Sequence, residues 1–281
     1  MSSYCVSTIL SNEDSELVLG RCYTLEMLGC EEESVDDGVR VKIYFNDSGS
    51  AEKAEEYLKE YDPRSPLLFY KIEEQDWNEQ WRKSMKPAKL APGFLVSPLW
   101  LPPDLHENDH WIKIEPKMAF GTGHHETTRL AAQAIISRKK WLCGKRLLDI
   151  GTGSGVLCFT ADFCGAAACF GVENDMDCRE NLAENYSQNI PGGQIDFIIG
   201  TTDCLDIQHF FDMIVMNMIL TESVPLLYQT SQLIKNQGLL IWSGILSDEN
   251  ESAIRYAAEA GFELVSKKSE NEWWCGTFQK K

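Results

Sequence analysis

Basic residues are scarce in this chain of 281 residues, in which 26 lysines and arginines stand against 43 aspartates and glutamates and give a formal net charge of −17. A surface of this charge repels phosphate backbones, so direct binding of nucleic acid is not expected. A basic protein or a small molecule is a better match as a substrate, and the charge alone leaves both open.

The sequence also lacks Cys-x-x-Cys pairs, a leader pattern and long apolar runs. The opening stretch, MSSYCVSTILSNEDSE, has no basic region and no sustained apolar core, which argues against a secretory signal. No apolar run is long enough to span a bilayer, so no membrane partner is expected. The ten cysteines are scattered, and we predict that they are reduced thiols of a cytoplasmic protein.

The organisation of the chain predicts two domains joined by a helix. Residues 1–72 form a small α/β unit, because RVKIYF (40–45) alternates as a strand does, residues 51–61 carry one apolar stripe at helical spacing, and LLFYKI (67–72) is a further short apolar run. The charged segment 73–90, with Trp77 and Trp81 four residues apart, is predicted to be a linker helix. Residues 91–281 then form the larger, catalytic domain.

Short apolar runs alternate with helical patterns from residue 145 onward, which predicts a parallel sheet covered on both faces. The last stretch, FELVSKKSENEWWCGTFQ, leaves no room for a helix and is predicted to be a hairpin that ends the sheet antiparallel. The predicted strands are 146–150, 169–173, 195–200, 212–217 and 238–246, and the predicted helices include one with Cys178, Leu182, Ala183 and Tyr186 on a shared face and one with Val224, Leu227, Tyr228, Ser231 and Ile234 on a shared face.

The segment LLDIGTGSGVL is predicted to be a strand, a tight turn and the start of a helix, an arrangement that brings backbone N–H groups close to a ligand. Gly151 and Gly153 match the first two positions of a dinucleotide-binding loop, but Val156 stands where that loop has its third glycine. Asp149, just before the turn, would repel a pyrophosphate and attract a cation. These residues disfavour a nicotinamide-dependent oxidoreductase.

S-adenosylmethionine is the cofactor that these charges favour, because it carries a sulfonium and an ammonium group and no phosphate. The next predicted strand ends in Glu173, about 20 residues beyond the turn, where a carboxylate accepts hydrogen bonds from both ribose hydroxyls. The combination predicts cofactor binding and resembles the class I methyltransferases. That resemblance implies an α/β fold with a Rossmann-like seven-stranded sheet, preceded here by the small N-terminal α/β domain.

Two polar residues follow later predicted strands. Asp203 comes just after the third strand of the series, where it either bonds the adenine amine or is an acid of a surface turn. Asn217 closes the strand 212–217. Its amide is predicted to lie near the reacting methyl group or the methionine part, with a simple strand-end cap as the alternative.

A separate glycine-rich turn, AFGTGHHETT, precedes the helix that leads into the strand 146–150. Phe120, Gly121, Thr122 and Gly123 are predicted to form a lid over the methionine end of the cofactor. The N–H groups and hydroxyls of the first helical turn after this lid can hold a carboxylate.

The two histidines after the lid, His124 and His125, do not predict a metal site. Adjacent side chains point to different sides of the chain, and no third ligand stands at zinc spacing. His125 is instead expected to fix the lid by a hydrogen bond.

The lid resembles that of one family, the methyltransferases of large-subunit ribosomal protein eleven (the PrmA family), which reads Phe-Gly-Thr-Gly-Thr-His-Pro-Thr-Thr. Similarity extends to most of residues 70–278. The further matching segments are DWNEQWRKSMKP, LLDIGTGSGVL, GVEND, IVMN, LIWSGIL and EWWC. The lid positions that match are Phe120, Gly121, Thr122, Gly123, His125, Thr127 and Thr128.

The resemblance implies transfer of methyl groups from S-adenosylmethionine to a ribosomal protein that the smaller N-terminal domain recognises. It also implies cofactor contacts from Thr128, Gly151, Glu173 and Asn217. The chain departs from the family at several positions: His124 and Glu126 in the lid, Thr152 in the glycine loop, Glu173 in place of aspartate, and NMIL after the fourth strand, which is one residue longer than the family's pattern.

The sequence therefore predicts a protein-lysine N-methyltransferase, active as a monomer, with an N-terminal amine as a second kind of acceptor. Asn217 is the one residue predicted to act in catalysis, by orienting the amine, and no general base is identified. Two alternatives stay open: a class I methyltransferase that acts on another protein or a small molecule, and a protein that binds the cofactor without activity.

Overall fold

The computed structural model describes residues 3–35, 38–72, 85–117, 119–189 and 192–281. The chain divides into two compact units, Met1–Met85 and Lys86–Lys281, and each is described by itself. Of the predicted linker helix at 73–90, residues 73–84, with Trp77 and Trp81, lie outside the described residues. The limits drawn from the sequence, 1–72, 73–90 and 91–281, therefore stay a prediction.

The smaller unit is an antiparallel sheet of four strands with two helices. Its strand order, β2-β3-β1-β4, together with the chain order βαββαβ, gives a ferredoxin-like arrangement. The apolar stripe of the helix predicted at 51–61 is buried against β1 and β3, with Ala51 and Ala54 fully enclosed. The elements are β1 (Ser3–Leu10), α1 (Asn12–Tyr23), β2 (Met27–Val35), β3 (Gly38–Phe45), α2 (Ser48–Tyr61) and β4 (Leu68–Ile72).

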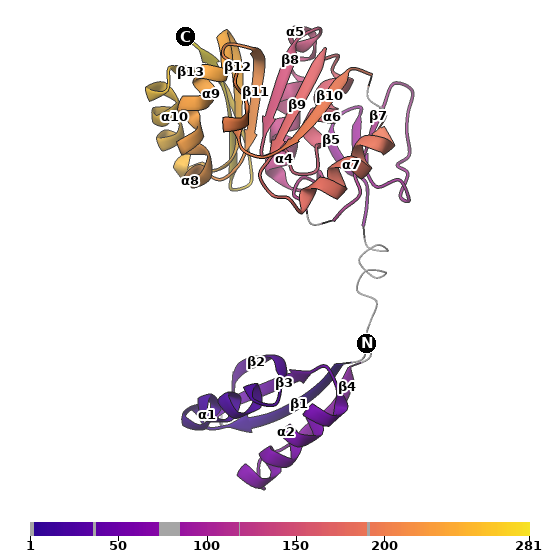
Figure 1. The fold of residues 1–281 in the computed structure, drawn as a ribbon, viewed down its shortest axis with the longest axis vertical. Coiled ribbons are helices and arrows are strands. Elements are labelled where there is room, and N and C mark those ends of the chain that lie inside the picture. The colour runs from indigo at the N-terminus through magenta and orange to yellow at the C-terminus, as the bar shows by residue number, and fades with distance from the viewer. Residues whose placement is uncertain (1–2, 36–37, 73–84, 118, 190–191) are drawn as a thin grey trace. The chain divides into compact units, whose positions relative to one another are not determined.

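The larger unit is built on a seven-stranded sheet of order β10-β9-β8-β11-β12-β14-β13 (Figure 1). The first five strands of this order pair in parallel, and β14 pairs antiparallel with both β12 and β13, so the predicted terminal hairpin is confirmed. The strands are β8 (Arg146–Ile150), β9 (Ala168–Glu173), β10 (Gln194–Ile199), β11 (Phe211–Asn217), β12 (Ile234–Leu246), β13 (Phe262–Glu270) and β14 (Trp273–Lys280).

Alternation along the strands creates a core on each face of the sheet, because successive side chains point to opposite sides. Leu147 and Val215 belong to one core, beneath α4 and α6, while Leu148 and Ile214 belong to the other, beneath α9 and α10. The helices of this unit are α4 (Glu126–Ile136), α5 (Lys139–Leu142), α6 (Val156–Phe163), α7 (Cys178–Asn189), α8 (Leu220–Ser223), α9 (Leu227–Leu233) and α10 (Asn250–Glu259).

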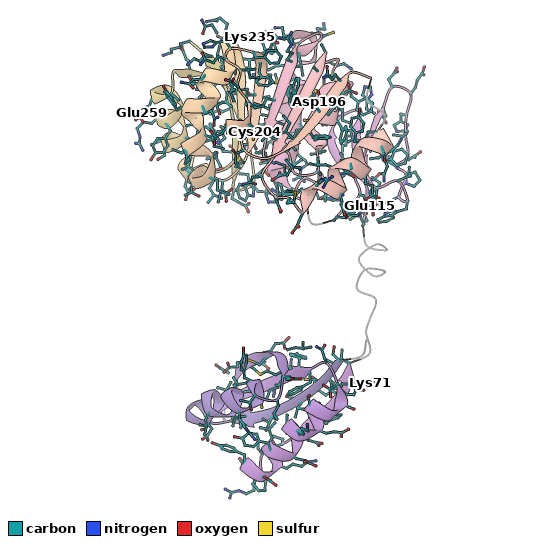
Figure 2. All side chains as sticks on the ribbon, viewed as in Figure 1. Lys71, Glu115, Asp196, Cys204, Lys235 and Glu259 are labelled. Atoms are coloured by element: carbon teal, nitrogen blue, oxygen red, sulfur yellow. The ribbon has the colours of Figure 1, made fainter. Side chains whose placement is uncertain are left out.

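A second, three-stranded sheet of order β5-β6-β7 comes before the large one in the chain. Its strands are β5 (Ala88–Ala91), β6 (Phe94–Ser97) and β7 (His110–Lys113). Beyond β7, Glu115 lies beside α7 (Figure 2), and its backbone N–H donates to Asn185 Oδ1 at 2.9 Å. The Asn181 side-chain amide donates to the Glu115 carbonyl. Two asparagines of α7 therefore hold the backbone of this segment.

Two helical faces predicted from the sequence are only partly confirmed: Cys178 and Leu182 of the first, and Leu227 and Ser231 of the second, are buried. On α7 the buried positions are Cys178, Asn181, Leu182 and Asn185, while Ala183 and Tyr186 are exposed. Asn181 and Asn185 are buried because their side chains form hydrogen bonds with backbone groups of other segments. Ala183 has no polar group that could form such a bond. In the segment predicted as a helix over 224–234, Tyr228 is 72 % exposed and Ile234 is already the first residue of β12.

Candidate functional site

The glycine turn lies at the carboxyl end of β8, where ligands bind in open α/β sheets. Gly151, Gly153 and Gly155 all have positive φ angles, 71°, 53° and 82°. Such angles are strained for residues with a Cβ atom. Gly155 is the N-cap of α6, so the turn ends at a helix N-terminus. The backbone N–H of Gly151 donates to Val172 O of β9 at 2.8 Å, which fixes the start of the turn.

The two glycine-rich turns are packed directly on each other. Ser154 joins them through two hydrogen bonds: its N–H donates to Phe120 O at 2.9 Å, and its hydroxyl donates to Gly121 O at 2.7 Å. A Cβ atom at Gly153 would lie 2.5 Å from Phe120 O, and one at Gly121 would lie 2.9 Å from Ser154 Oγ. Both glycines are therefore needed for this close approach. The lid turn, residues 120–123, forms one wall of the candidate site.

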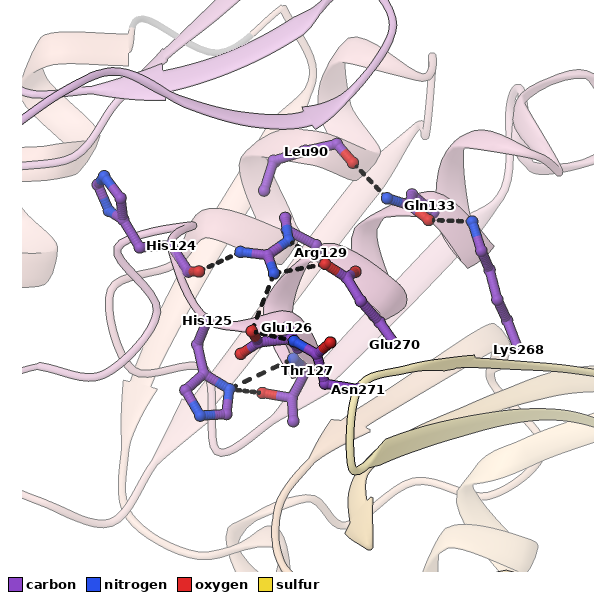
Figure 3. A network of polar contacts seen from close by, with 10 residues as sticks. All are labelled: Leu90, His124, His125, Glu126, Thr127, Arg129, Gln133, Lys268, Glu270 and Asn271. Carbon is purple, nitrogen blue, oxygen red and sulfur yellow. Dashed lines mark hydrogen bonds and ion pairs between the residues drawn. The ribbon is translucent and has the colours of Figure 1, made fainter. Parts of the chain in front are cut away.

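The lid continues into α4 through a polar network (Figure 3). His125 is the N-cap of α4, and its Nδ1 accepts from the Thr127 backbone N–H at 3.3 Å. Arg129 donates to the carbonyl of His124 and forms ion pairs with Glu126 at 3.3 Å and Glu270 of β13 at 2.5 Å. The lid is thus anchored to the sheet.

The remaining lid residues have different environments. Phe120 is 55 % exposed and packs edge-on against the His125 ring, with 5.5 Å between centroids. Thr122 is partly buried, and its hydroxyl lies 3.4 Å from His124 Nδ1. Gly123 is buried against Val96 of β6. The exposed aromatic ring is therefore the part of the lid that faces outward.

Glu173, the last residue of β9, is 8 % exposed and holds the glycine turn from the neighbouring strand. Its Oε2 accepts from the Gly153 backbone N–H at 2.8 Å, and its Oε1 accepts from Asp175 N–H at 3.0 Å. Each carboxylate oxygen has two lone pairs, so both keep acceptor capacity for a ligand hydroxyl.

Asp149 lies beneath the glycine turn, and the cation contact predicted for it from the sequence stays a prediction. Its side chain is 1 % exposed, beneath the turn, where Oδ2 accepts from the Thr152 hydroxyl at 2.7 Å. Oδ1 is buried and has no hydrogen-bond partner among the described residues. The Asp149 carboxylate is buried because strand alternation places it on the same side of β8 as Leu147, toward α6. Asp149 therefore holds the turn through Thr152, and its Oδ1 keeps acceptor capacity for a donor that the described residues do not supply.

The protonation of Asp149 should make stability depend on pH. Burial raises the pKa of this carboxyl to about 7, the Thr152 hydroxyl lowers it, and the Glu173 charge raises it. Since the folded-state pKa exceeds the unfolded value, this contribution is fully present below about pH 4 and is lost as the pH rises through 7. Asp149→Asn should remove it.

Urea unfolding of both proteins across this pH range measures the effect. The unfolding free energy of the wild type, minus that of Asp149→Asn, should decrease steadily with rising pH, while contributions from other carboxylates cancel in the difference. A difference that stays constant with pH would contradict this assignment.

Asn217 and Thr128 meet at the end of β11. Thr128 is fully buried in the first turn of α4, and its hydroxyl accepts from Asn217 Nδ2 at 3.4 Å. Asn217 Oδ1 is buried and has no partner among the described residues. A buried amide oxygen without a donor is costly, so a bound group that donates a hydrogen bond is expected there.

A pocket of about 90 Å³ opens beside Gly151 at the carboxyl edge of the sheet. Its lining is mainly apolar, which suits a flat ring, and it comes from β8, β9 and the segments after β10 and β11. The residues are Ile150, Gly151, Val172, Asn174, Gly200, Thr201, Thr202, Met218 and Leu226. Sequence reasoning missed Met218, Thr201 and Thr202, although Met218 immediately follows the strand end that the sequence identified.

Asp203 lies next to the pocket residues Thr201 and Thr202 and is exposed. Its carboxylate accepts from the Thr201 hydroxyl at 3.2 Å and from Gln229 Nε2 at 3.1 Å. These contacts hold the turn and leave lone pairs free, so both roles considered for Asp203 are compatible with its position.

The arrangement fits S-adenosylmethionine. An apolar pocket adjoins the turn, the Glu173 carboxylate lies beside it with free lone pairs, and the unpartnered Asn217 amide lies at the end of β11. The described residues include no group of three or more His, Cys, Asp or Glu side chains that could hold a metal ion. All ten cysteines are free thiols. Within the described part of the chain, no helix is long and apolar enough to cross a membrane.

Comparison with known proteins gives a consistent result. A family model described as ribosomal protein L11 methyltransferase (PrmA) matches residues 3–281. A protein of Desulfotalea psychrophila named ribosomal protein L11 methyltransferase is 32 % identical over 219 residues, which are 77 % of this chain and 72 % of that protein. One of the same name from Fusobacterium nucleatum is 30 % identical over 229 residues, 81 % of this chain and 73 % of that protein.

Among solved structures, the crystal structure of a ribosomal protein L11 methylase from Lactobacillus delbrueckii subsp. bulgaricus superimposes with a TM-score of 0.62. The alignment has 24 % identity and covers 70 % of this chain and 100 % of that one. This similarity concerns the fold, and with the strand order described above it confirms the class I methyltransferase architecture predicted from the sequence.

Proposed function

Since the chain belongs to the ribosomal protein L11 methyltransferase (PrmA) family, we propose that it methylates ribosomal protein L11 on lysine side chains, with an N-terminal amine as a second kind of acceptor. It is an S-adenosylmethionine-dependent methyltransferase of the class I fold. The names of its relatives support the choice of substrate, and the acceptor atoms are inferred from the chemistry of the site.

The observation that carries the proposed mechanism is the unpartnered amide oxygen of Asn217. The cofactor supplies an electrophilic methyl group on a sulfonium sulfur. An acceptor amine has N–H groups to donate, and Asn217 Oδ1 is an acceptor to which no described residue donates. We assign Asn217 the role of orienting the amine so that its lone pair points to the methyl group, since alignment provides much of the acceleration in such a displacement.

A lysine must lose a proton before it can react, because its pKa is ordinarily about 10.4. The acceptor position beside the buried Asn217 oxygen is shielded from water, which disfavours the ammonium form and lowers that pKa. Deprotonation can then occur to water as the side chain enters, so the mechanism requires no dedicated general base.

We propose that the other site residues bind the cofactor, hold the glycine turn, or do both. Glu173 accepts from the ribose hydroxyls while holding Gly153, and Gly151 lets the cofactor approach the backbone closely. Thr128 holds the Asn217 amide in place and contributes to the methionine end. The lid residues 120–123 cover that end.

Recognition of the ribosomal protein is assigned to residues 1–72, as the family resemblance implies. The formal charge of −17 suits a basic partner, and attraction of this kind chiefly increases the association rate. A partner without clustered lysines would not associate faster through this attraction.

Transfer of labelled methyl groups from S-adenosylmethionine into purified L11 tests the proposal, with a lysine-free L11 as the matched substrate. We expect strong incorporation into L11, a sharp loss in the lysine-free protein, and slower transfer at high salt. No incorporation into L11, with cofactor binding intact by calorimetry, would contradict the proposed substrate. Full incorporation into the lysine-free protein would contradict lysine as the acceptor.

A further inference from the structure

A pocket of about 230 Å³, separate from the cofactor site, lies between the second half of α4 and the terminal hairpin. It shares no lining residue with the pocket beside Gly151. Its charged lining residues are Arg138, Lys267 and Lys268, and no aspartate or glutamate lines it. We call the side chains of Arg138 and Lys268, together with the Ser266 hydroxyl, the basic pocket.

The Arg138 guanidinium at this pocket is partly buried and has no ion-pair partner among the described residues. Its NH1 donates to Ala134 O at 3.2 Å and to the Ser137 hydroxyl at 3.0 Å, and its NH2 donates to the Ser266 hydroxyl at 2.7 Å. Capping the end of α4 explains the first of these bonds. Desolvation lowers the pKa of this group, and a charge removed from water normally has a counter-charge.

One lysine adds charge that helix capping does not explain. Lys268 is exposed on β13, and its Nζ donates to Gln133 Oε1 at 2.5 Å (Figure 3), which holds it beside α4. Lys267, the residue before it, pairs with Gly276, and its side chain points to the opposite face of the sheet. In a chain with 43 acidic and 26 basic residues, a pocket that the Arg138 and Lys268 side chains reach, and that no aspartate or glutamate lines, is a local reversal of charge.

We propose that the basic pocket binds a phosphate group. A planar guanidinium donates in a fork that matches phosphate oxygens, and the flexible Lys268 ammonium supplies additional positive charge. The Ser266 hydroxyl, which accepts from Arg138, can donate to a remaining oxygen. A single carboxylate would leave one of the two positive charges unmatched. The net negative charge opposes nucleic-acid binding over the surface as a whole, but it does not govern this pocket, because exposed charges farther than about 8 Å are screened at physiological salt.

Calorimetric titration of the full chain with inorganic pyrophosphate at low salt tests the proposal. We expect one site per chain. Lys268→Gln should weaken binding about fivefold, and adding Arg138→Gln should weaken it about tenfold or more, as expected for loss of charge-assisted hydrogen bonds. The matched control is Lys89→Gln/Arg255→Gln, which removes two exposed cations elsewhere and should change affinity less than about twofold.

A second arm uses a short single-stranded RNA and identifies the source of the phosphate. Tighter binding of RNA than of pyrophosphate, lost in the same variants, assigns the pocket to a nucleic-acid backbone, and equal binding assigns it to a free phosphate compound. If the double variant fails to fold, Lys268→Gln alone decides the test. Absence of pyrophosphate binding up to about 10 mM, or equal weakening by the control pair, would overturn the proposal.

Discussion

Gly153→Ala is expected to weaken S-adenosylmethionine binding, and with it methyl transfer, about a hundredfold. Gly153 has a φ of 53°, and an added Cβ would lie 2.5 Å from Phe120 O, a backbone atom that cannot rotate away. The same residue donates its N–H to Glu173 at 2.8 Å. Separating the two turns would therefore move the lid and the proposed ribose acceptor together, and a displacement of about 1 Å in an active site can cost two orders of magnitude.

Gly144→Ala is the matched control for this substitution. Gly144 also has a positive φ, 75°, but an added Cβ meets nothing within 4 Å. Both variants should lose about 1 kcal/mol of stability from the strained backbone, while only Gly153→Ala should lose cofactor affinity. Calorimetric binding and urea unfolding measure the two effects separately. Equal cofactor affinity in the two variants would show that contact between the turns does not shape the site.

Asn217→Ala should lower the turnover number about a hundredfold and change cofactor affinity much less. This is the size of effect seen when one preorganised polar group acting on the reacting centre is removed. The amide oxygen has no partner in the described chain, and its amide nitrogen already contacts Thr128, so its orientation is fixed before substrate binds. Because the amide is oriented before the substrate binds, we expect its loss to lower kcat rather than cofactor affinity.

Asn236→Ala serves as the control, because Asn236 is an exposed asparagine of the same sheet, far from any proposed role. Its turnover and affinity should match those of the wild type. Steady-state kinetics with L11, together with calorimetry for the cofactor, separate the two constants. A normal turnover number in Asn217→Ala would remove the amide from the mechanism and leave substrate alignment to the walls of the pocket.

The sequence predicted the sheet well because its strands are short apolar runs bounded by glycine and polar residues. The predicted strand 212–217 lies within β11, which ends at Asn217, and the predicted strand 169–173 lies within β9, which ends at Glu173. Parallel strands end at a common edge, so marking their last residues was enough to gather Gly151, Glu173 and Asn217 in one place.

Other features required knowledge of contacts between distant segments. Ser154 joins the two turns through Phe120 and Gly121, which are more than 30 residues away, and no local pattern signals such a bond. Asn181 and Asn185 are buried because they bond to backbone groups of other segments, whereas helical periodicity counts only apolar side chains. The burial of Asp149 was accessible from the sequence: strict alternation along β8 places it on the same side as Leu147.

The central claim is that the two packed glycine turns and the carboxyl edge of the sheet form a single cofactor site. A crystal structure of the complex with S-adenosylmethionine tests it most directly. The account predicts the adenosine beside Gly151, with its ribose on Glu173, and the methionine end beneath residues 120–123, with the methyl group next to Asn217. A cofactor bound away from these turns, or one that contacts neither Glu173 nor Asn217, would contradict the account.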